Sequence, residues 1–146
     1  MPLDRIAEKT VKAQGMERHC NGLILAVSGG PDSMAMLEWY AARTLPFPLT
    51  VAHVHHGLRP ESDQEEQMVL ARCAQLNLPC RVFHGNVKAS MQQGETVESA
   101  ARRIRYEFFR TLAKERCATH LATAHTRDDQ CETVLFRLLR GTSLRG

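Results

Sequence analysis

The 146-residue chain has no long apolar run and few aromatic side chains. Its longest strongly apolar run, Leu23 to Val27, is far shorter than the roughly 20 residues that cross a bilayer. The N-terminus carries Asp4, Arg5, Glu8 and Lys9 where a secretory signal would have an apolar stretch. The sequence therefore predicts a protein with no membrane span and no secretory signal.

Paired cysteines are also absent. The five cysteines are an odd number and are scattered without a CxxC motif: Cys20, Cys73, Cys80, Cys117 and Cys131. This pattern argues against a disulfide framework and against a cysteine zinc site, and it predicts a reducing, cytoplasmic location. Aromatic residues make up 5% of the chain, so the sequence indicates no surface on which RNA bases could stack.

Neither sign of charge dominates. Lys and Arg number 19 and Asp and Glu number 16, which gives a net charge of +3 with neutral histidines. This small excess permits a polyanionic partner but is far below that of proteins that coat nucleic acids. The hydrophobic fraction of 43% and the charged fraction of 24% are typical of a globular protein, and the length fits one domain.

Short apolar runs alternate with longer stretches of helical periodicity. Strands are predicted at residues 23–27, 49–54, 80–84 and 121–124. Helices are predicted at 4–18, at 32–43, after a cap at Ser62, from Thr96 and from about Thr126, the last with an apolar side of Val134, Leu135, Leu138 and Leu139.

Strands that alternate with helices require right-handed crossovers. We therefore predict a doubly wound, Rossmann-like α/β domain over residues 23–146, with a parallel sheet covered by helices on both faces. Residues 1–22 form a helical extension in this scheme. Because ligands of such sheets bind at the carboxyl ends of the strands, the segments that follow the strands are the candidates for function.

The segment after the first strand has the composition of a phosphate-binding loop. It consists of Ser28, Gly29, Gly30, Pro31, Asp32 and Ser33, and it opens a predicted helix. Glycines let the backbone approach an anion, and a helix N-terminus adds N–H groups and the positive end of its dipole. The serine hydroxyls can donate to phosphate oxygens, whereas the Asp32 carboxylate suits a metal ion or a helix cap. A plain tight turn would also use these glycines, but the SGGxDS pattern favours phosphate binding over it.

Three histidines, His53, His55 and His56, end the second strand. They suggest a metal site, but strand alternation places the first two on one face and the third beyond it. No carboxylate or cysteine in the segment 53–59 completes a ligand set. We therefore predict a structural or substrate-lining role for these histidines. Arg59 either reaches a phosphate or lies on the surface, and the sequence leaves both open.

Acidic residues cluster after the fourth strand. Asp128 and Asp129 would lie in the first turn of the helix from Thr126, with Glu132 one turn further on the same side. Acidic residues often stabilise a helix N-terminus, but that role does not account for Glu132. Three carboxylates beside a phosphate loop would repel ATP, so we predict a bound cation, either Mg²⁺ or a cationic substrate.

These motifs resemble a known family. The SGGPDS segment is similar to the PP-loop of the N-type ATP pyrophosphatases, which cleave ATP between its α and β phosphates. The segments HHGLRPES, ESAARRIRY, HTRDDQCET and RLLRGTSLRG follow it in order. Together they resemble the tRNA(Ile)-lysidine synthetases, over nearly the whole chain from Leu23 to Gly146.

The resemblance implies a reaction that uses ATP, Mg²⁺, L-lysine and a tRNA(Ile) with a CAU anticodon. The C2 oxygen of the wobble cytidine attacks the α phosphorus, and the lysine ε-amine then displaces AMP. The loop of residues 28–33 would bind the pyrophosphate, and Asp32 and Asp129 would hold Mg²⁺. The catalytic residues implied are Asp32, Arg102, His125, Asp129 and Glu132. Glu132 would bind or deprotonate the lysine ammonium, and either Arg102 or Arg105 would meet a phosphate, the lysine carboxylate or the tRNA.

Two other readings stay open at this point. A PP-loop enzyme that thiolates tRNA would normally carry cysteine pairs, which this chain lacks. Alternatively, the chain is an ATP-binding module that is inactive alone, because full members of the family continue beyond the RGTSLRG segment. We expect residues 23–146 to be a PP-loop ATP-binding domain that lacks its C-terminal end. A homodimer is neither required nor excluded.

Overall fold

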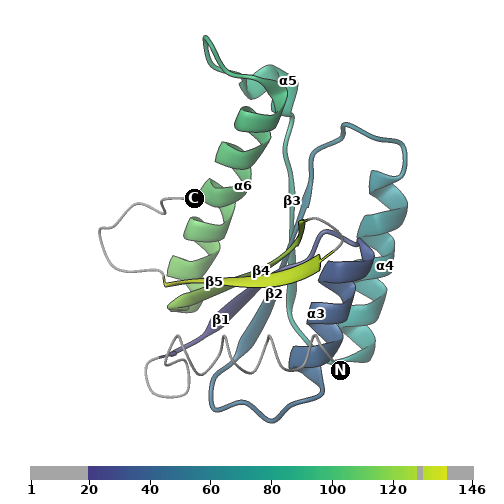
Figure 1. Ribbon diagram of the computed structural model, residues 1–146, viewed down its shortest axis with the longest axis vertical. Helices are drawn as coiled ribbons and strands as arrows, with labels where there is room; N and C mark the ends of the chain where they lie inside the picture. Colours follow the sequence, from purple (N-terminus) through teal and green to yellow (C-terminus); the bar gives the residue numbers. More distant parts are fainter. Residues whose placement is uncertain (1–19, 128–129, 138–146) are drawn as a thin grey trace.

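The computed structural model describes residues 20–127 and 130–137, with side chains through Ala124. Helices and strands alternate along most of this range (Figure 1). The elements are β1 (Leu23–Ala26), α3 (Pro31–Ala41), β2 (Leu49–His55), α4 (Ser62–Gln75), β3 (Cys80–His84), α5 (Val87–Ser90), α6 (Val97–Arg116), β4 (His120–Arg127) and β5 (Gln130–Arg137).

The strands form one sheet in the order β3-β2-β1-β4-β5. β1 pairs in parallel with both β2 and β4, and β2 pairs in parallel with β3. Along the chain, β2 and then β3 are added on one side of β1, and β4 and then β5 are added on its other side. This reversal lies between β1 and β4, and the predicted α/β fold with a parallel sheet is confirmed.

The helices cover both faces of the sheet (Figure 1). On one face, Leu25 and Val51 of the sheet pack with Leu37 of α3 and Val69 of α4. On the other face, a second cluster joins sheet residues to α6, and its members are Ile24, Ala52, Tyr106, Phe109, Leu112, Ala113 and Leu121. β1 is apolar on both faces because it contributes Leu23 and Leu25 to one cluster and Ile24 to the other.

The long helix α6 begins where its sequence predicts. Thr96 is the N-cap, and its side chain accepts a hydrogen bond from the backbone N–H of Ser99 at 3.1 Å. The Ser99 hydroxyl accepts one in return from the backbone N–H of Thr96 at 3.0 Å, which completes a capping box. α4 differs from expectation: Ser62 is its first residue, and the N-cap is Glu61, which makes no side-chain capping bond.

The helix predicted from Thr126 is wrong. Residues 130–137 form β5, which pairs antiparallel with β4. The spacing of Val134 and Leu135 suits a helix, but Thr133, Val134 and Phe136 also favour strands, and short apolar runs do not distinguish the two. Without β5, one side of β4 would carry unpaired backbone N–H and C=O groups. Residues 130–137 satisfy these groups when they form a strand beside β4.

Three smaller points complete the comparison with the sequence. The short helix α5 lies between β3 and α6, in a segment where the sequence predicts neither a helix nor a strand. The predicted helix at 4–18 falls outside the described residues. Every helix in the described part of the chain is too short or too polar to cross a membrane.

The capping box predicts a specific loss of stability. Thr96→Ala removes the hydrogen bond to the Ser99 N–H and is expected to lower the free energy of unfolding by about 0.5–2 kcal/mol. The control is Thr111→Ala in the C-terminal half of the same helix, where the hydroxyl donates to the Glu107 carbonyl. Urea unfolding of the two variants measures the difference, and equal losses in both would contradict the capping role.

Candidate functional site

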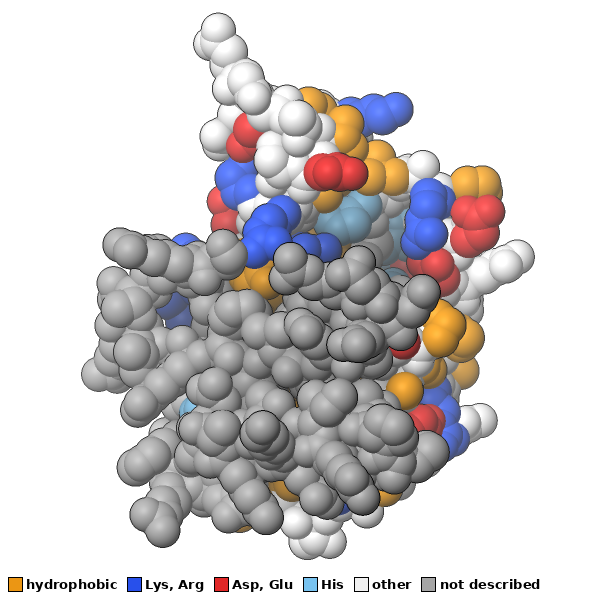
Figure 2. Space-filling model, viewed as in Figure 1, with side chains coloured by type: hydrophobic (Ala, Val, Ile, Leu, Met, Phe, Trp, Pro, Cys, Tyr) orange, Lys and Arg blue, Asp and Glu red, His pale blue; other side chains and the backbone are white. Residues whose placement is uncertain are grey.

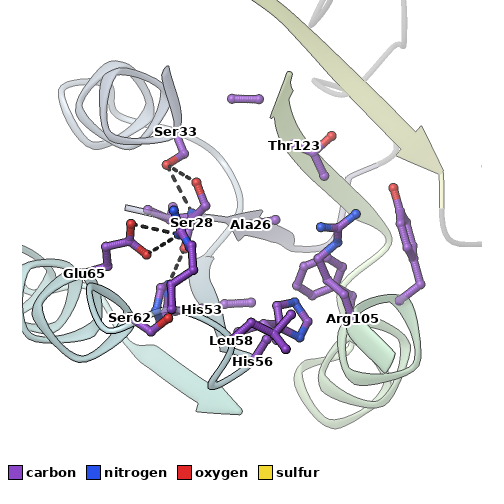
Figure 3. Close-up of a pocket in the computed structure, with 17 residues that line it drawn as sticks. Ala26, Ser28, Ser33, His53, His56, Leu58, Ser62, Glu65, Arg105 and Thr123 are labelled. Carbon is purple, nitrogen blue, oxygen red and sulfur yellow. Dashed lines mark hydrogen bonds and ion pairs between the residues drawn. The ribbon is translucent and has the colours of Figure 1, made fainter. Parts of the chain in front are cut away.

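A cavity of about 520 Å³ lies at the carboxyl ends of β1, β2 and β4. It is bounded by the segment after β1, by the start of α4 and by the face of α6 (Figure 3). Its charged and polar lining residues are Ser28, Ser33, His53, His56, Arg59, Ser62, Glu65, Arg105 and Thr123. The cavity therefore occupies the edge of the sheet at which ligands of this fold class bind.

The loop between β1 and α3 is organised by one buried hydroxyl. The Ser33 Oγ accepts hydrogen bonds from the backbone N–H groups of Ser28 and Gly29, both at 3.1 Å. It also donates to the Gly30 carbonyl at 3.1 Å and lies 3.1 Å from the Ser28 Oγ. The hydroxyl oxygen thus sits where converging N–H groups meet, which is the position that an anion takes in such a backbone concavity.

Two backbone features make this turn possible. Gly29 has a φ of +96°, a region that other residues adopt only with strain. Pro31 is in the first turn of α3, where its missing N–H removes no helical hydrogen bond. The loop therefore leads directly into the N-terminus of α3, and the positive end of that helix dipole faces the same edge of the sheet.

The structure places the residues of the predicted phosphate loop in two groups. Ser28 and Ser33 line the cavity directly. Gly29, Gly30 and Pro31 form the turn behind them, and Asp32 is a half-buried acidic residue in the first turn of α3.

An ion pair supports the loop from α4. A Cβ placed on Gly29 would lie 3.1 Å from the Cβ of Glu65, so the two residues are in close contact. The Arg59 guanidinium donates to both oxygens of the Glu65 carboxylate, at 3.0 and 2.9 Å. Arg59 therefore neutralises an acidic side chain beside the loop. The sequence does not reveal the role of Glu65, because its contact with Gly29 depends on how α4 packs on the sheet.

His53 is a structural residue that also lines the cavity. Its side chain is buried, with 2% of its surface exposed, and its Nδ1 donates to the Val27 carbonyl at 2.7 Å. This bond ties β2 to the last residue before the loop. The position agrees with the structural or lining role that the sequence predicts for these histidines.

His56 lines the same cavity from the segment after β2. Burial, assisted by the positive charge of Arg105 and by His53 and His55, lowers the pKa of His56 and keeps its ring neutral. Its buried Nδ1 has no hydrogen-bond partner within the described part of the chain. The ring is thus an uncharged part of the cavity wall.

Arg105 and Arg102 occupy different positions on α6. Arg105 is half-buried and lines the cavity, opposite Ser28 and Ser33 (Figure 3). Burial lowers the pKa of its guanidinium, and no carboxylate pairs with it among the residues described. Arg102 is exposed, and its guanidinium carbon lies 5.1 Å from the centroid of the Tyr106 ring. Of the two, Arg105 is the cation that faces the site.

The predicted acidic site after β4 is altered by the strand pairing. His125 of β4 and Glu132 of β5 are partners across the two antiparallel strands. The expectation that Glu132 shares a helix face with Asp128 and Asp129 is therefore wrong, because Glu132 lies in a strand. Asp128 and Asp129 fall outside the described residues, as do the side chains of His125 and Glu132.

Comparison with known proteins adds independent information. Residues 3–146 match the family described as the PP-loop domain. The chain is 44% identical over 128 residues to a tRNA(Ile)-lysidine synthase from Bradyrhizobium sp., covering 85% of this chain and 35% of the relative. It is 41% identical over 143 residues to the enzyme of that name from Methylobacterium sp., covering 98% of this chain and 41% of the relative. The chain thus spans well under half the length of these relatives.

A solved structure shows the same fold. A tRNA thiolase from Methanococcus maripaludis superposes with a TM-score of 0.71 over 86% of this chain and 45% of its own, at 18% sequence identity.

The loop geometry predicts unequal effects of three alanine substitutions. Gly94→Ala meets nothing within 4 Å, so it is expected to cost only the roughly 1–2 kcal/mol of a left-handed residue, because φ there is +83°. Gly29→Ala has the same backbone strain and also presses on Glu65, so its loss should be larger. Gly30→Ala, with ordinary φ and a nearest contact of 3.6 Å, should unfold close to the parent chain.

Urea unfolding of the three variants ranks the losses. If Gly29→Ala and Gly94→Ala lose the same stability, the contact between the loop and α4 does not constrain this turn.

Proposed function

Because the chain belongs to the PP-loop domain family, we propose that it is the ATP-binding part of a ligase that joins L-lysine to C2 of the wobble cytidine of tRNA(Ile). The names of the similar proteins support this substrate assignment. The observation that carries it is the cavity itself. On one side of the cavity, the backbone N–H groups of Ser28 and Gly29 converge on the Ser33 hydroxyl. On the opposite side lies Arg105, which has no carboxylate partner among the described residues.

The reaction that we propose has two steps. The cytidine C2 oxygen attacks the α phosphorus of ATP, and the bond from that phosphorus to the bridging oxygen of the β phosphate breaks to release pyrophosphate. The lysine ε-amine then attacks C2, loses a proton, and displaces AMP as the C2–O bond breaks. Both leaving groups are anionic, so catalysis needs positive charge and N–H donors fixed around them.

The loop supplies those donors on one side of the cavity. A phosphate oxygen that takes the place of the Ser33 hydroxyl would receive the N–H groups of Ser28 and Gly29, and the α3 dipole would stabilise its charge. Arg105 on the other side can form a charge-assisted bond to the same nucleotide. The ion pair between Arg59 and Glu65 removes the repulsion that an unpaired carboxylate beside the loop would cause.

Asp32 fits Mg²⁺ by its chemistry and its place. Its carboxylate is a hard oxygen donor in the first turn of the helix that the loop opens, and Mg²⁺ is commonly held by one or two carboxylates together with phosphate oxygens. The ion would neutralise the phosphates and polarise them toward attack. We assign Asp129 as a second carboxylate on the resemblance alone.

The lysine and the tRNA are proposed to bind to predicted site residues outside the ATP cavity. Glu132 and His125, which are partners across β4 and β5, and Arg102 on the exposed side of α6 are the residues that we propose for them. An exposed arginine suits a phosphate of a large anionic partner better than a buried nucleotide. The cytoplasmic location stays a prediction of the sequence.

The proposed reaction is tested by its products. Purified chain incubated with ATP, Mg²⁺, L-lysine and tRNA(Ile) bearing a CAU anticodon should release AMP only when both lysine and this tRNA are present, because the first step releases pyrophosphate and leaves the AMP on the tRNA. Thin-layer chromatography of labelled ATP measures both products. Product release with another acceptor would contradict the substrate assignment. Binding of ATP with Mg²⁺ without turnover would identify an ATP-binding module, in line with the length that the chain spans in its relatives.

The two arginines of α6 provide a sharper test of the ATP site. Arg105→Gln removes the cation that lines the cavity and is expected to weaken ATP binding by about tenfold or more, the value of one charge-assisted hydrogen bond. Arg102→Gln on the same helix is the matched control and should leave ATP affinity unchanged, because Arg102 is exposed. Isothermal titration with ATP and Mg²⁺ measures both, and the reverse order of effects would contradict the assignment.

A further inference from the structure

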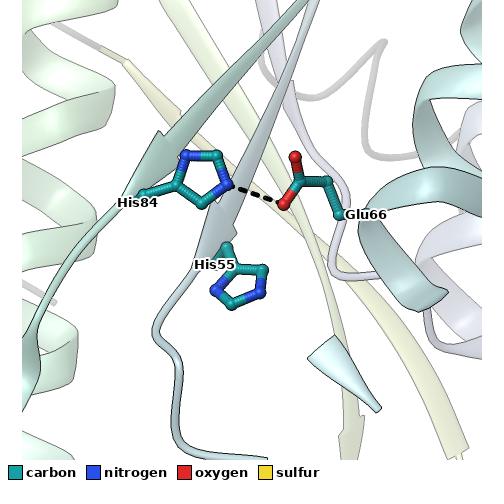
Figure 4. A group of neighbouring side chains, drawn as sticks. All are labelled: His55, Glu66 and His84. Carbon is teal, nitrogen blue, oxygen red and sulfur yellow. Dashed lines mark hydrogen bonds and ion pairs between the residues drawn. The ribbon is translucent and has the colours of Figure 1, made fainter. Parts of the chain in front are cut away.

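A second polar cluster lies beside the cavity but outside it. It is formed by His55 at the end of β2, His84 at the end of β3 and Glu66 of α4 (Figure 4). One ligand atom from each of these residues lies within 4.8 Å of the others. None of the three lines the cavity described above. Histidine side chains reach the surface on the face shown in Figure 2, next to acidic and basic side chains.

The backbone holds the two imidazoles together. His55 and His84 are register partners of the parallel strands β2 and β3, so their side chains leave the same face of the sheet. Their ring centroids are 5.1 Å apart. Because strand pairing sets this spacing, the two rings are arranged before any ligand arrives, which lowers the entropic cost of binding one.

Carboxylates from α4 complete the cluster. Glu66 Oε2 lies 2.7 Å from His84 Nε2, and Asp63 Oδ1 lies 2.7 Å from His55 Nε2. Asp63 and Glu66 are three residues apart on the helix and therefore lie on neighbouring turns of one side. Each imidazole thus has one nitrogen beside a carboxylate oxygen.

The donor set indicates the kind of ion. Two imidazoles with one or two carboxylates suit zinc and the other divalent transition metals, whereas Mg²⁺ prefers oxygen donors and retained waters. The side chains of His55 and Glu66 are only 13% and 14% exposed, while that of His84 is 63% exposed. His55 and Glu66 therefore form the buried side of the site. The exposed side is at His84, where an ion can enter from solvent.

We propose that His55, Glu66 and His84 bind a divalent transition metal of the zinc type. This proposal does not rest on the proposed ligase activity. The ion would join β2, β3 and α4 at one point, immediately before the segment that carries His56, Leu58 and Arg59 into the cavity. Its role is thus to set the backbone conformation of that segment.

Metal binding has one structural consequence that can be observed. The Gly57 N–H now donates to His55 Nδ1 at 3.1 Å, so the His55 proton is on Nε2 and points to Asp63. A metal at Nε2 displaces that proton, and the neutral ring must then carry its proton on Nδ1. The Gly57 N–H has to turn away from Nδ1, so an ion bound here changes the backbone at Gly57.

The test uses the full chain, freed of metal with a chelator, and Zn²⁺ alone as the probe. One Zn²⁺ per chain should bind in competition with a chromophoric chelator. His84→Ala and, independently, Glu66→Gln should each weaken binding by at least about tenfold, a loss typical even of partners outside the first ligand shell. Arg81→Ala, on the same edge strand β3, is the matched control and should bind Zn²⁺ like the parent chain.

Two spectra locate the ion. Co²⁺ in place of Zn²⁺ should give visible absorption without the strong sulfur charge-transfer band that binding at Cys117 or another thiol would produce. The amide resonance of Gly57 should shift on addition of Zn²⁺ in the parent chain and not in His84→Ala. Absence of saturable Zn²⁺ binding, or equal affinity in the parent chain and both ligand variants, would overturn the proposal.

Discussion

The pairing of β1 on both of its sides is the constraint on which the site depends. β1 is central, with β2 on one side and β4 on the other, and all three strands run in the same direction. Their carboxyl ends consequently meet at one edge, where the chain must turn sharply from β1 into α3. The SGGPDS turn, His53, Arg105 and Thr123 come from distant parts of the sequence, and this strand order is the reason that they share one cavity.

Hydrogen bonds fix the loop of the cavity, and its charged side chains leave it a net positive charge. The buried Ser33 hydroxyl collects two backbone N–H groups, so the loop keeps its shape without an anion in place. Arg59 and Glu65 neutralise each other, whereas Arg105 keeps a positive charge against the cost of burial that lowers its pKa. The resulting excess of positive charge is what an anionic nucleotide requires.

The three histidines at the end of β2 and directly after it show what a local sequence pattern can and cannot predict. Their segment contains no complete set of metal ligands, and for His53 and His56 the expectation of a structural or lining role agrees with the structure. For His55 the missing partners come from β3 and α4, at positions 84 and 66, with Asp63 closer along the chain. The prediction of a helix from Thr126 was wrong for a related reason. The apolar run at 134–139 suits a helix or a strand, and pairing with the edge of β4 makes residues 130–137 a strand.

The sequence by itself determined the strands β1 to β4, the helices α3, α4 and α6, and the identity of the loop. Apolar runs located β1 to β4, the capping residues located the start of α6, and the SGGPDS segment after β1 pointed to phosphate binding. These features are local, because strand and helix periodicity, capping and turn chemistry act over a few residues. The tertiary structure decided that Arg105 and not Arg102 faces the cavity, that Glu65 supports Gly29, that His55 meets Glu66 and His84, and that residues 130–137 form a strand. Each of these depends on strand order and helix packing, which bring together residues that no local pattern relates.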